Sequence, residues 1–335
     1  MLEPISPAEA KQRFLNHSES KYSSNTLREY GYSLQRFVEW CDENRISNMN
    51  KVTSRTVADF ADDRGEDVKV ATLKTDLDRV RVFIRYCESI EGVAEGVADK
   101  ILTPDLSEDE ETRSERLHEQ DAEAVLDYLE RFEYASLKHA IMELMWHTQL
   151  RRGALRGLDV GDIEYDHGSP YIIVAHRPEA GTPLKNKYSG EREVAINKHV
   201  HDVLQDYIEY HRVDATDEYG REPLFTSKNG RLGKTAFQRI CYGFTRPCIY
   251  ANECPHDRDL DECEANTYNT ASKCPSSRSP HAIRRGAIQK ALNNGASKDN
   301  VSSRCNTSTE VLDKHYDTDK QAELRRRRSR DLDKY

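Results

Sequence analysis

The feature that most constrains this chain is a short acidic segment at 104–116, PDLSEDEETRSER. It begins with Pro104 and contains a single aliphatic residue, so it offers almost no surface to bury in a core. Apolar residues recur at helical spacing both before and after it. We therefore predict two separately packed domains, over 1–103 and 117–335, joined by an acidic linker over 104–116.

The first predicted domain is helical. Thr26 and Glu29 have the spacing of a capping box, which predicts a helix start at Thr26. Three apolar stripes follow at the intervals of a helix face. Their members are Leu27, Tyr30, Leu34, Phe37, Val38 and Cys41, then Val57, Phe60 and Ala61, then Leu73, Leu77, Val80, Phe83, Ile84 and Cys87.

The second predicted domain mixes helices with a small sheet. Two short apolar runs predict strands, separated by a long connection with turn-forming residues at both ends. A polar stretch at about 248–278 has the character of an insertion. The fold class we expect is mainly α with a small antiparallel β-sheet (α+β). The predicted strands are 171–174 and 193–196, and the predicted helices are 122–132, 137–150, 200–211 and one from about 280.

Charge and hydropathy limit the partners of the chain. It lacks an apolar run of about eighteen residues and an N-terminal signal core, so we expect a soluble, cytoplasmic protein with no membrane partner. With 59 acidic and 50 basic residues its net charge is −9, which argues against a polyanionic ligand. The other interpretation is an acidic protein of a high-salt cytoplasm that gathers its basic residues in one groove. Only local clusters of basic residues can distinguish these two interpretations.

The segment SPHAIR at 279–284 predicts a helix start that binds an anion. Serine is a preferred N-cap and proline a preferred first helical residue. His281 and Arg284 then lie on one face in the first turn, where free N–H groups and the helix dipole favour an anion. An imidazole and a forked guanidinium in that place suit a phosphate. Two ordinary polar residues on a surface helix are the competing interpretation.

Three further residues are candidates for the same site. Arg151 lies between two helical patterns, in TQLRRGALR at 148–156, where an arginine can point into a cleft. Lys185, in the connection between the strands, is a candidate proton donor near a phosphate. Tyr316 needs cationic neighbours before its hydroxyl becomes a nucleophile. Taken singly, each is more often an ordinary surface or packing residue.

In chain order these residues resemble the tyrosine recombinase, or phage integrase, family. TQLRRGALRGLDVGDI is similar to the box of the first catalytic arginine, which falls on Arg151. SPHAIRRGA is similar to the box of the histidine and second arginine, His281 and Arg284. STEVLDKHYD is similar to the nucleophile box and places the nucleophile at Tyr316, and Lys185 matches the hairpin lysine. The sequences of these boxes resemble those of haloarchaeal integrases in particular, which fits the excess of acidic over basic residues.

The resemblance implies a fold, a reaction and partners. The N-terminal part resembles the family's core-type DNA-binding domain, and 117–335 resembles its catalytic domain. The implied reaction is site-specific cleavage and rejoining of double-stranded DNA through a 3′-phosphotyrosine, by a homotetramer on two duplexes. It implies no cofactor for catalysis, because the energy of the phosphodiester is kept in the enzyme–DNA bond.

The chain departs from the family pattern in three places. Ala154 stands where the family usually has an acidic residue that supports the site. The family's His or Trp nine or ten residues before the nucleophile is missing from VSSRCN at 301–306. There Asn306 or Arg304 is the candidate that donates a hydrogen bond to the phosphate instead. The long connection between the strands also leaves Lys187 as a competitor of Lys185.

Four of the eight cysteines fall in the predicted insertion. Without a secretory signal, a disulfide framework is not expected. Together with His256 as a substitute ligand, they match the four thiolate or imidazole ligands of a structural zinc ion. Closely spaced CxxC pairs are absent, so free cysteines in a loop are the alternative. The four are Cys248, Cys254, Cys263 and Cys274.

Three other functions stay open at this stage. A DNA-binding regulator that keeps the fold without catalysis fits Ala154 and the altered 301–306 segment. A type IB topoisomerase shares the arginines, lysine, histidine and tyrosine, but relaxes DNA without a partner duplex. A helical interaction protein with no nucleic-acid ligand is supported by the net charge alone.

Overall fold

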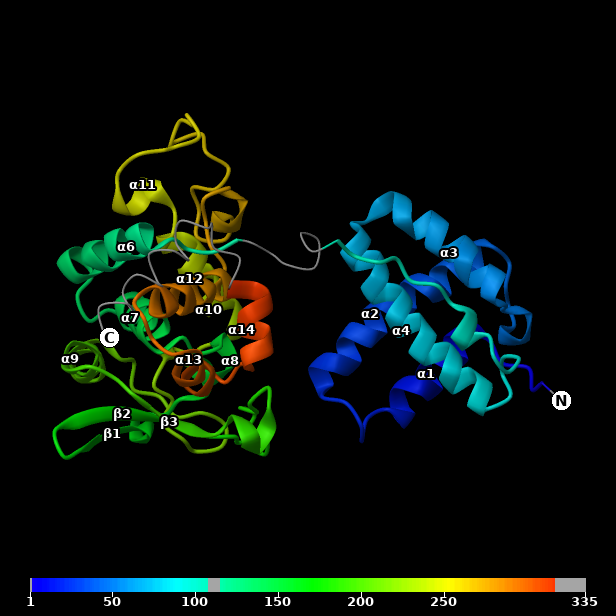
Figure 1. Cartoon of the computed structure of the whole chain (residues 1–335), viewed down its shortest axis with the longest axis horizontal. Coiled ribbons are helices and arrows are strands. Elements are labelled where there is room, and N and C mark those ends of the chain that lie inside the picture. The colour runs from blue at the N-terminus through cyan, green and yellow to red at the C-terminus, as the bar shows by residue number, and fades with distance from the viewer. Residues whose placement is uncertain (1, 108–114, 317–335) are drawn as a thin grey trace, which may run out of the picture. The chain divides into compact units, whose positions relative to one another are not determined.

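The computed structural model describes residues 2–107 and 115–316, and its chain divides into two compact units, Met1–Arg113 and Ser114–Tyr335 (Figure 1). Part of the predicted acidic linker, 108–114, and the basic run Arg325–Arg328 lie outside the described residues. The two units are described separately.

The first unit is a helical bundle in its described part. The predicted apolar stripes meet in one core, in which Phe83 packs edge-to-face on Phe14 and Phe37, with ring centroids 5.7 and 6.3 Å apart. Phe37 also meets Phe60, at 5.2 Å. The elements are α1 (Pro7–His17), α2 (Ser24–Glu43), η1 (Met49–Lys51), α3 (Ser54–Asp67), α4 (Val70–Ser89) and η2 (Ala98–Lys100).

The predicted capping box at Thr26 and Glu29 is wrong. Helix α2 begins two residues earlier, and Ser23 is its N-cap, with Oγ accepting from the backbone N–H of Thr26 at 3.2 Å. Thr26 therefore already has helical backbone in the first turn, because a preferred N-cap residue stands just upstream of it. A capping box does form at α3, between Thr53 and Thr56.

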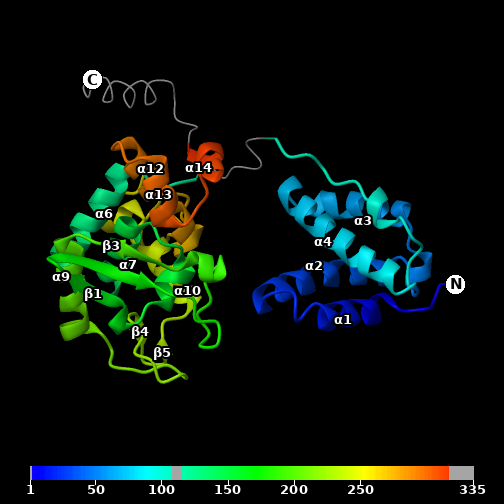
Figure 2. The same cartoon turned by 60° about the horizontal axis from the view of Figure 1, so that its bottom comes forward.

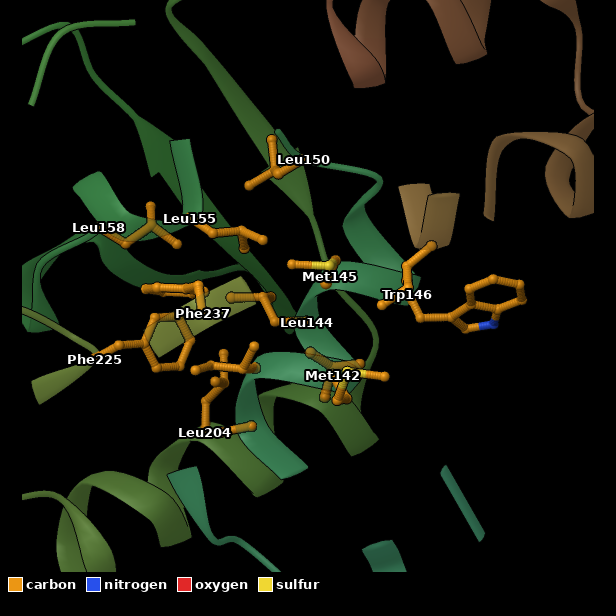
Figure 3. Close-up of a cluster of buried hydrophobic side chains, with 14 of the residues drawn as sticks. Met142, Leu144, Met145, Trp146, Leu150, Leu155, Leu158, Leu204, Phe225 and Phe237 are labelled. Carbon is orange, nitrogen blue, oxygen red and sulfur yellow. The ribbon is translucent and has the colours of Figure 1, made fainter. Parts of the chain in front are cut away.

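The second unit packs helices around α7 (Leu137–Thr148), which is buried over most of its length. Figure 3 shows side chains from α7 meeting side chains from later parts of the chain in one apolar cluster. Those later residues include Leu150, Leu155, Leu158, Leu204, Phe225 and Phe237. The other helical elements before the C-terminal region are α6 (Glu119–Phe132), α8 (Arg152–Gly157), η3 (Val160–Asp162), α9 (Lys198–Asp206), the π-helical turn η5 (Tyr207–His211), α10 (Lys234–Phe244) and α11 (Pro247–Tyr250).

A three-stranded antiparallel sheet with strand order β1-β2-β3 lies at the lower edge of this unit in Figure 1. The two predicted strands pair with Ile172 opposite Val194, and both side chains are buried. The prediction missed β1, a strand of only four residues that are mostly exposed. The expected mainly helical fold with a small antiparallel sheet is confirmed. The strands are β1 (Ile163–Asp166), β2 (Ser169–Val174), β3 (Arg192–Ala195) and the separate pair β4 (Thr226–Ser227) and β5 (Gly230–Arg231); η4 (Lys187–Gly190) lies between β2 and β3.

Three consecutive helices end the described chain: α12 (Pro280–Asn293), α13 (Lys298–Cys305) and α14 (Thr309–Tyr316), with η6 (Ala271–Lys273) before them. They lie side by side in Figures 1 and 2 and share a small apolar cluster that includes Ile288, Val301 and Leu312. The segment 301–306 is therefore the end of a helix and its cap. Within the described ranges, no helix is both long and apolar enough to cross a membrane.

Gly286, in α12, marks the closest approach of this helix to the start of the unit. A Cβ atom there would lie 1.9 Å from the carbonyl oxygen of Leu117 and 3.0 Å from the ring of Trp146. The backbone N–H of Leu117 also donates to the carbonyl of Ala282, at 3.1 Å. Only glycine allows α12 and the 117 segment to keep this contact.

Gly286→Ala should therefore destabilise the second unit by about 1–3 kcal/mol, because a backbone atom has to move away from the new methyl group. Gly243→Ala is the matched control, since a Cβ at this helical glycine meets nothing within 4 Å. Urea unfolding of both variants measures the difference. Equal midpoints would contradict the close approach.

Candidate active site

Arg151 reaches from the end of α7 to the end of α13. Gln149 caps α7 in the left-handed region, with φ 58°, which turns the chain and leaves Arg151 as the N-cap of α8. Its Nη1 donates to the carbonyl oxygen of Asn306 at 2.7 Å, and its Nη2 donates to Thr307 Oγ1 at 3.2 Å. The arginine at the predicted junction thus spans two parts of the chain that are 155 residues apart.

Arg284 converges on the same threonine from α12. It is 2% exposed, and its Nη2 donates to Thr307 Oγ1 at 2.6 Å and to the carbonyl oxygen of Cys305 at 2.9 Å. Its Nη1 donates to the carbonyl of Gln149. The guanidinium groups of Arg151 and Arg284 are therefore neighbours, joined through one hydroxyl.

The helix start predicted at Ser279 is confirmed, because Ser279 Oγ accepts from the N–H of Ala282 at 3.2 Å and Pro280 is the first helical residue. The placement of both charged residues in the first turn is half wrong. His281 is there, but Arg284 is the fifth residue of α12 and begins the second turn. Its side chain, and not its backbone N–H, faces the cluster.

The end of α13 holds a third arginine that the sequence did not single out. Arg192, at the start of β3, donates from Nε to the carbonyl of Arg304 at 2.8 Å and from Nη1 to the carbonyl of Gly190 at 2.6 Å. The last carbonyls of a helix lack intrahelical partners and carry the negative end of its dipole. Arg192, Arg284 and Arg151 thus donate hydrogen bonds to the backbone carbonyls of residues 304–306, which end α13 and form its cap.

Positive charge accumulates at this place. Burial, followed by the charges of Arg284, Arg151 and Arg304, lowers the pKa of Arg192 to about 10, against a smaller opposing effect of Cys305. A guanidinium loses affinity for its proton only where other cations or burial make its charge costly. The cluster therefore favours an anion beside it.

His281 is neutral in this environment. Desolvation, followed by the charges of Arg285, Arg284, Arg151 and Lys185, lowers the pKa of His281 to about 4. The residue keeps contact with solvent, and the four positive charges add to the effect of desolvation. A neutral imidazole beside an anion-binding cluster can accept a proton at pH 7.

Lys185 is exposed, on the connection between β2 and β3, and its charge acts on His281. The connection is docked on the end of α13 by Asn306, whose Oδ1 accepts from Asn186 Nδ2 and whose Nδ2 donates to the carbonyl of Ser189 at 2.9 Å. The neighbouring Lys187 has φ 52°, in the left-handed region.

Asn306 and Arg304, the two candidates for the missing His or Trp, both donate side-chain hydrogen bonds to backbone carbonyls in this structure. The side chain of Asn306 is occupied by the β2–β3 connection, and Arg304 Nη2 donates to the carbonyl of His147 at 3.1 Å. Thr307, which stands nine residues before Tyr316, lies at the centre of the cluster instead. Its distance from the predicted nucleophile was the signal that sequence reasoning overlooked.

Tyr316 is the last residue of α14, which begins two residues after Thr307. Its side chain lies outside the described part of the structure, so its assignment as the nucleophile stays a prediction. Leu312 anchors α14 against α12 and α13.

The four cysteines of the insertion are half-buried and not joined by disulfides. In the described ranges, the only group of three or more His, Cys, Asp or Glu residues at metal-ligand spacing is Glu130, His139 and His199. His139 Nδ1 accepts from the N–H of Ala135 at 3.1 Å, so its proton is on Nε2, facing Glu130 at 3.3 Å. A histidine that binds a metal through Nε2 needs the opposite tautomer, so this group does not suit a metal ion.

Comparison with known families identifies the chain. The model of the phage integrase family matches residues 115–308, and the model of the phage integrase N-terminal SAM-like domain matches residues 12–89. Together they span most of both units, and the chain belongs to the phage integrase family. The first match ends before Tyr316. No curated protein matches the chain.

Solved structures confirm the tyrosine recombinase fold. The integrase of transposon Tn1549, in complex with circular intermediate DNA, is 15% identical with a TM-score of 0.65, over 96% of this chain and 98% of that chain. A lambda integrase dimer bound to a COC′ core site is 13% identical with a TM-score of 0.61, over 97% and 78%. The N-terminal domain of a phage integrase/site-specific recombinase from Haloarcula marismortui is 29% identical over 30% of this chain and 99% of that chain, with a TM-score of 0.30.

Thr307→Val removes the hydroxyl that accepts from both arginines while keeping the shape of the side chain. We expect a loss of about 1–3 kcal/mol in unfolding free energy, because partly buried charged donors lose their acceptor. Thr307→Ser, which keeps the hydroxyl, should stay close to the wild type. Denaturant unfolding of the three proteins checks this, and equal stability of the valine and serine variants would contradict the shared contact.

The ring of His281 should titrate with a midpoint of about 4 in the free protein. Its folded-state pKa lies below its ordinary value of 6.5, so any stability that it contributes is present above pH 6.5 and is lost as pH falls toward 4. NMR of the imidazole Cε1–H across pH measures the midpoint. A midpoint near 6.5 would show that neither desolvation nor the surrounding cations act on this ring.

Proposed function

We propose that this protein is a site-specific DNA recombinase that cleaves and rejoins DNA strands through a 3′-phosphotyrosine on Tyr316. The observation that carries the proposal is the convergence of Arg151 and Arg284 on Thr307, with neutral His281 and Lys185 around them. Membership of the phage integrase family supports the class of reaction.

The arginine cluster would bind the scissile phosphate. Guanidinium forks suit phosphate oxygens, and here backbone carbonyls already orient them before any ligand arrives. Arg151 and Arg284 would hold the two non-bridging oxygens and stabilise the charge that grows on them in the transition state. Because these contacts exist in the ground state, little reorganisation is needed during the reaction.

The reaction has a simple balance of bonds and protons. The Tyr316 oxygen attacks phosphorus and forms the new P–O bond, while the bond from phosphorus to the 5′ oxygen breaks. His281 is neutral at pH 7 and would accept the phenolic proton, and Lys185 would give a proton to the leaving oxygen. A 5′ hydroxyl of the partner duplex then reverses the step. The arginines supply the charge stabilisation, so the proposal assigns no catalytic cofactor.

The proposed partner is double-stranded DNA in the cytoplasm, held by a homotetramer on two duplexes during strand exchange. The solved Tn1549 integrase holds DNA, and the lambda integrase is a dimer on a core site. Positive charge at the arginine cluster supports this partner despite the negative net charge, since phosphate binding depends on local charge.

Tyr316→Phe should abolish the covalent DNA adduct and leave DNA retention nearly unchanged, because only the attacking oxygen is removed. The full-length protein is incubated with a library of nicked duplexes, and DNA that stays attached after denaturation is sequenced. Tyr188→Phe, at a tyrosine exposed on the β2–β3 connection, is the control.

Different results would point to different functions. An adduct in Tyr316→Phe would remove Tyr316 as the nucleophile. Salt-sensitive DNA retention by the wild type without any adduct would identify a DNA-binding regulator. Relaxation of supercoiled DNA without a partner duplex would identify topoisomerase activity.

A further inference from the structure

We propose that Cys248, Cys254 and Cys274 bind one structural zinc ion, with Cys263 or His256 as the fourth ligand, and that the ion braces the insertion in front of α12. This site is separate from the arginine cluster. It concerns the stability of the second unit and not the chemistry at the phosphate.

The insertion has little apolar core of its own. Between the end of α10 and the start of α12, the structure has only two short elements, α11 and η6. The buried apolar residues of this stretch are Ala265 and Ala271, which are too small to make a core. A long polar segment of this kind gains most from a metal cross-link.

The base of the insertion is closed by hydrogen bonds. The backbone N–H of Arg278 donates to Thr245 Oγ1 at 2.7 Å, which joins the two ends of the segment. The carbonyl of Cys274 accepts from both the N–H and the hydroxyl of Ser277, at 3.0 and 2.8 Å. Cys274 is therefore fixed just before Ser279, the N-cap of the helix that carries His281 and Arg284.

Two further contacts bring the remaining ligands toward this base. The buried guanidinium of Arg246, two residues before Cys248, donates to the carbonyl of Ala265, two residues after Cys263. His256 Nε2 lies 2.9 Å from the hydroxyl of Ser276. This second contact brings the 254–256 segment beside the 274–276 segment.

The cysteines share a backbone arrangement. Cys254, Cys263 and Cys274 each accept, on their carbonyl, the N–H of the residue three positions later, at 3.3, 2.9 and 3.0 Å. Each of the three thus begins a tight turn. The thiols of Cys274 and Cys254 also lie close enough to act electrostatically on Cys248.

In the described structure the thiols act on one another electrostatically but do not lie at metal-ligand spacing. A zinc ion would draw sulfur atoms to about 2.3 Å from itself. The segment has little regular secondary structure, so this contraction does not require a long helix or a sheet to move. His256 can ligate through Nδ1 while Nε2–H donates to Ser276, the outer-shell contact that ligating histidines usually make. Cys263 competes with it for the fourth place.

The test uses the full-length protein, purified without metal-affinity resin or added metal. We expect about one zinc per chain by elemental analysis, and almost none in Cys248→Ser/Cys274→Ser. The control is His199→Ala, which alters the Glu130–His139–His199 group and should keep its zinc. Zinc near zero in the wild type, or zinc that persists in the cysteine variant and is lost in His199→Ala, would overturn the proposal.

A second measurement does not depend on folding of a variant. Titration of wild-type protein with an organomercurial should release the zinc in step with modification of the half-buried thiols, while Cys41, Cys87, Cys241 and Cys305 are buried. Release only after global unfolding would contradict the thiol site. The fourth ligand is the one of Cys263→Ser and His256→Ala that weakens zinc retention, and retention of zinc by both variants would reject the tetrahedral set.

Discussion

The backbone carbonyls at the end of α13 hold the groups around which the candidate active site is arranged. Arg192, Arg284 and Arg151 come from β3, α12 and the α7–α8 junction, and they donate to carbonyls at 304, 305 and 306. Neutral dipoles orient guanidinium groups without neutralising them, unlike carboxylates. The same interaction therefore fixes the geometry of the cluster and preserves its charge for an anionic ligand.

The packing of α12 makes this arrangement possible. Its buried face lies against α7 and the 117 segment, where only a glycine fits at 286. Its N-cap at Ser279 sets the direction of the first turn, and with it the place of His281. A shift of α12 would move a histidine and an arginine of the site together, which is why contacts far from the cluster, including those of the insertion, bear on it.

The β2–β3 connection is attached to the same helix end. Both the oxygen and the nitrogen of the Asn306 side-chain amide form hydrogen bonds to this connection. The connection carries Lys185, whose charge acts on His281. In this chain an amide that docks a loop, and a threonine that links two arginines, stand where the family usually has a ring. Although the protein is acidic overall, several positive charges gather at this helix terminus.

The sequence by itself determined most of the elements and the family resemblance. Apolar spacing gave the long helices and the two buried strands, and Ser279-Pro280 gave the start of α12, because these signals are local. The order of Arg151, His281, Arg284 and Tyr316 gave the family resemblance. The exposed strand β1 and the true N-cap of α2 escaped, since the strand has only four residues and the N-cap stands three residues before the predicted start.

Only the tertiary structure decided what each side chain contacts. In the sequence alone, Arg192 resembles an ordinary charged residue of a strand and Thr307 an ordinary loop residue. In the structure, both belong to the arginine cluster. Asn306 was expected at the phosphate and instead docks a loop 120 residues away in the chain. Contacts between segments so far apart depend on how α7, α12 and α13 pack, and residue spacing along the chain records nothing of that packing.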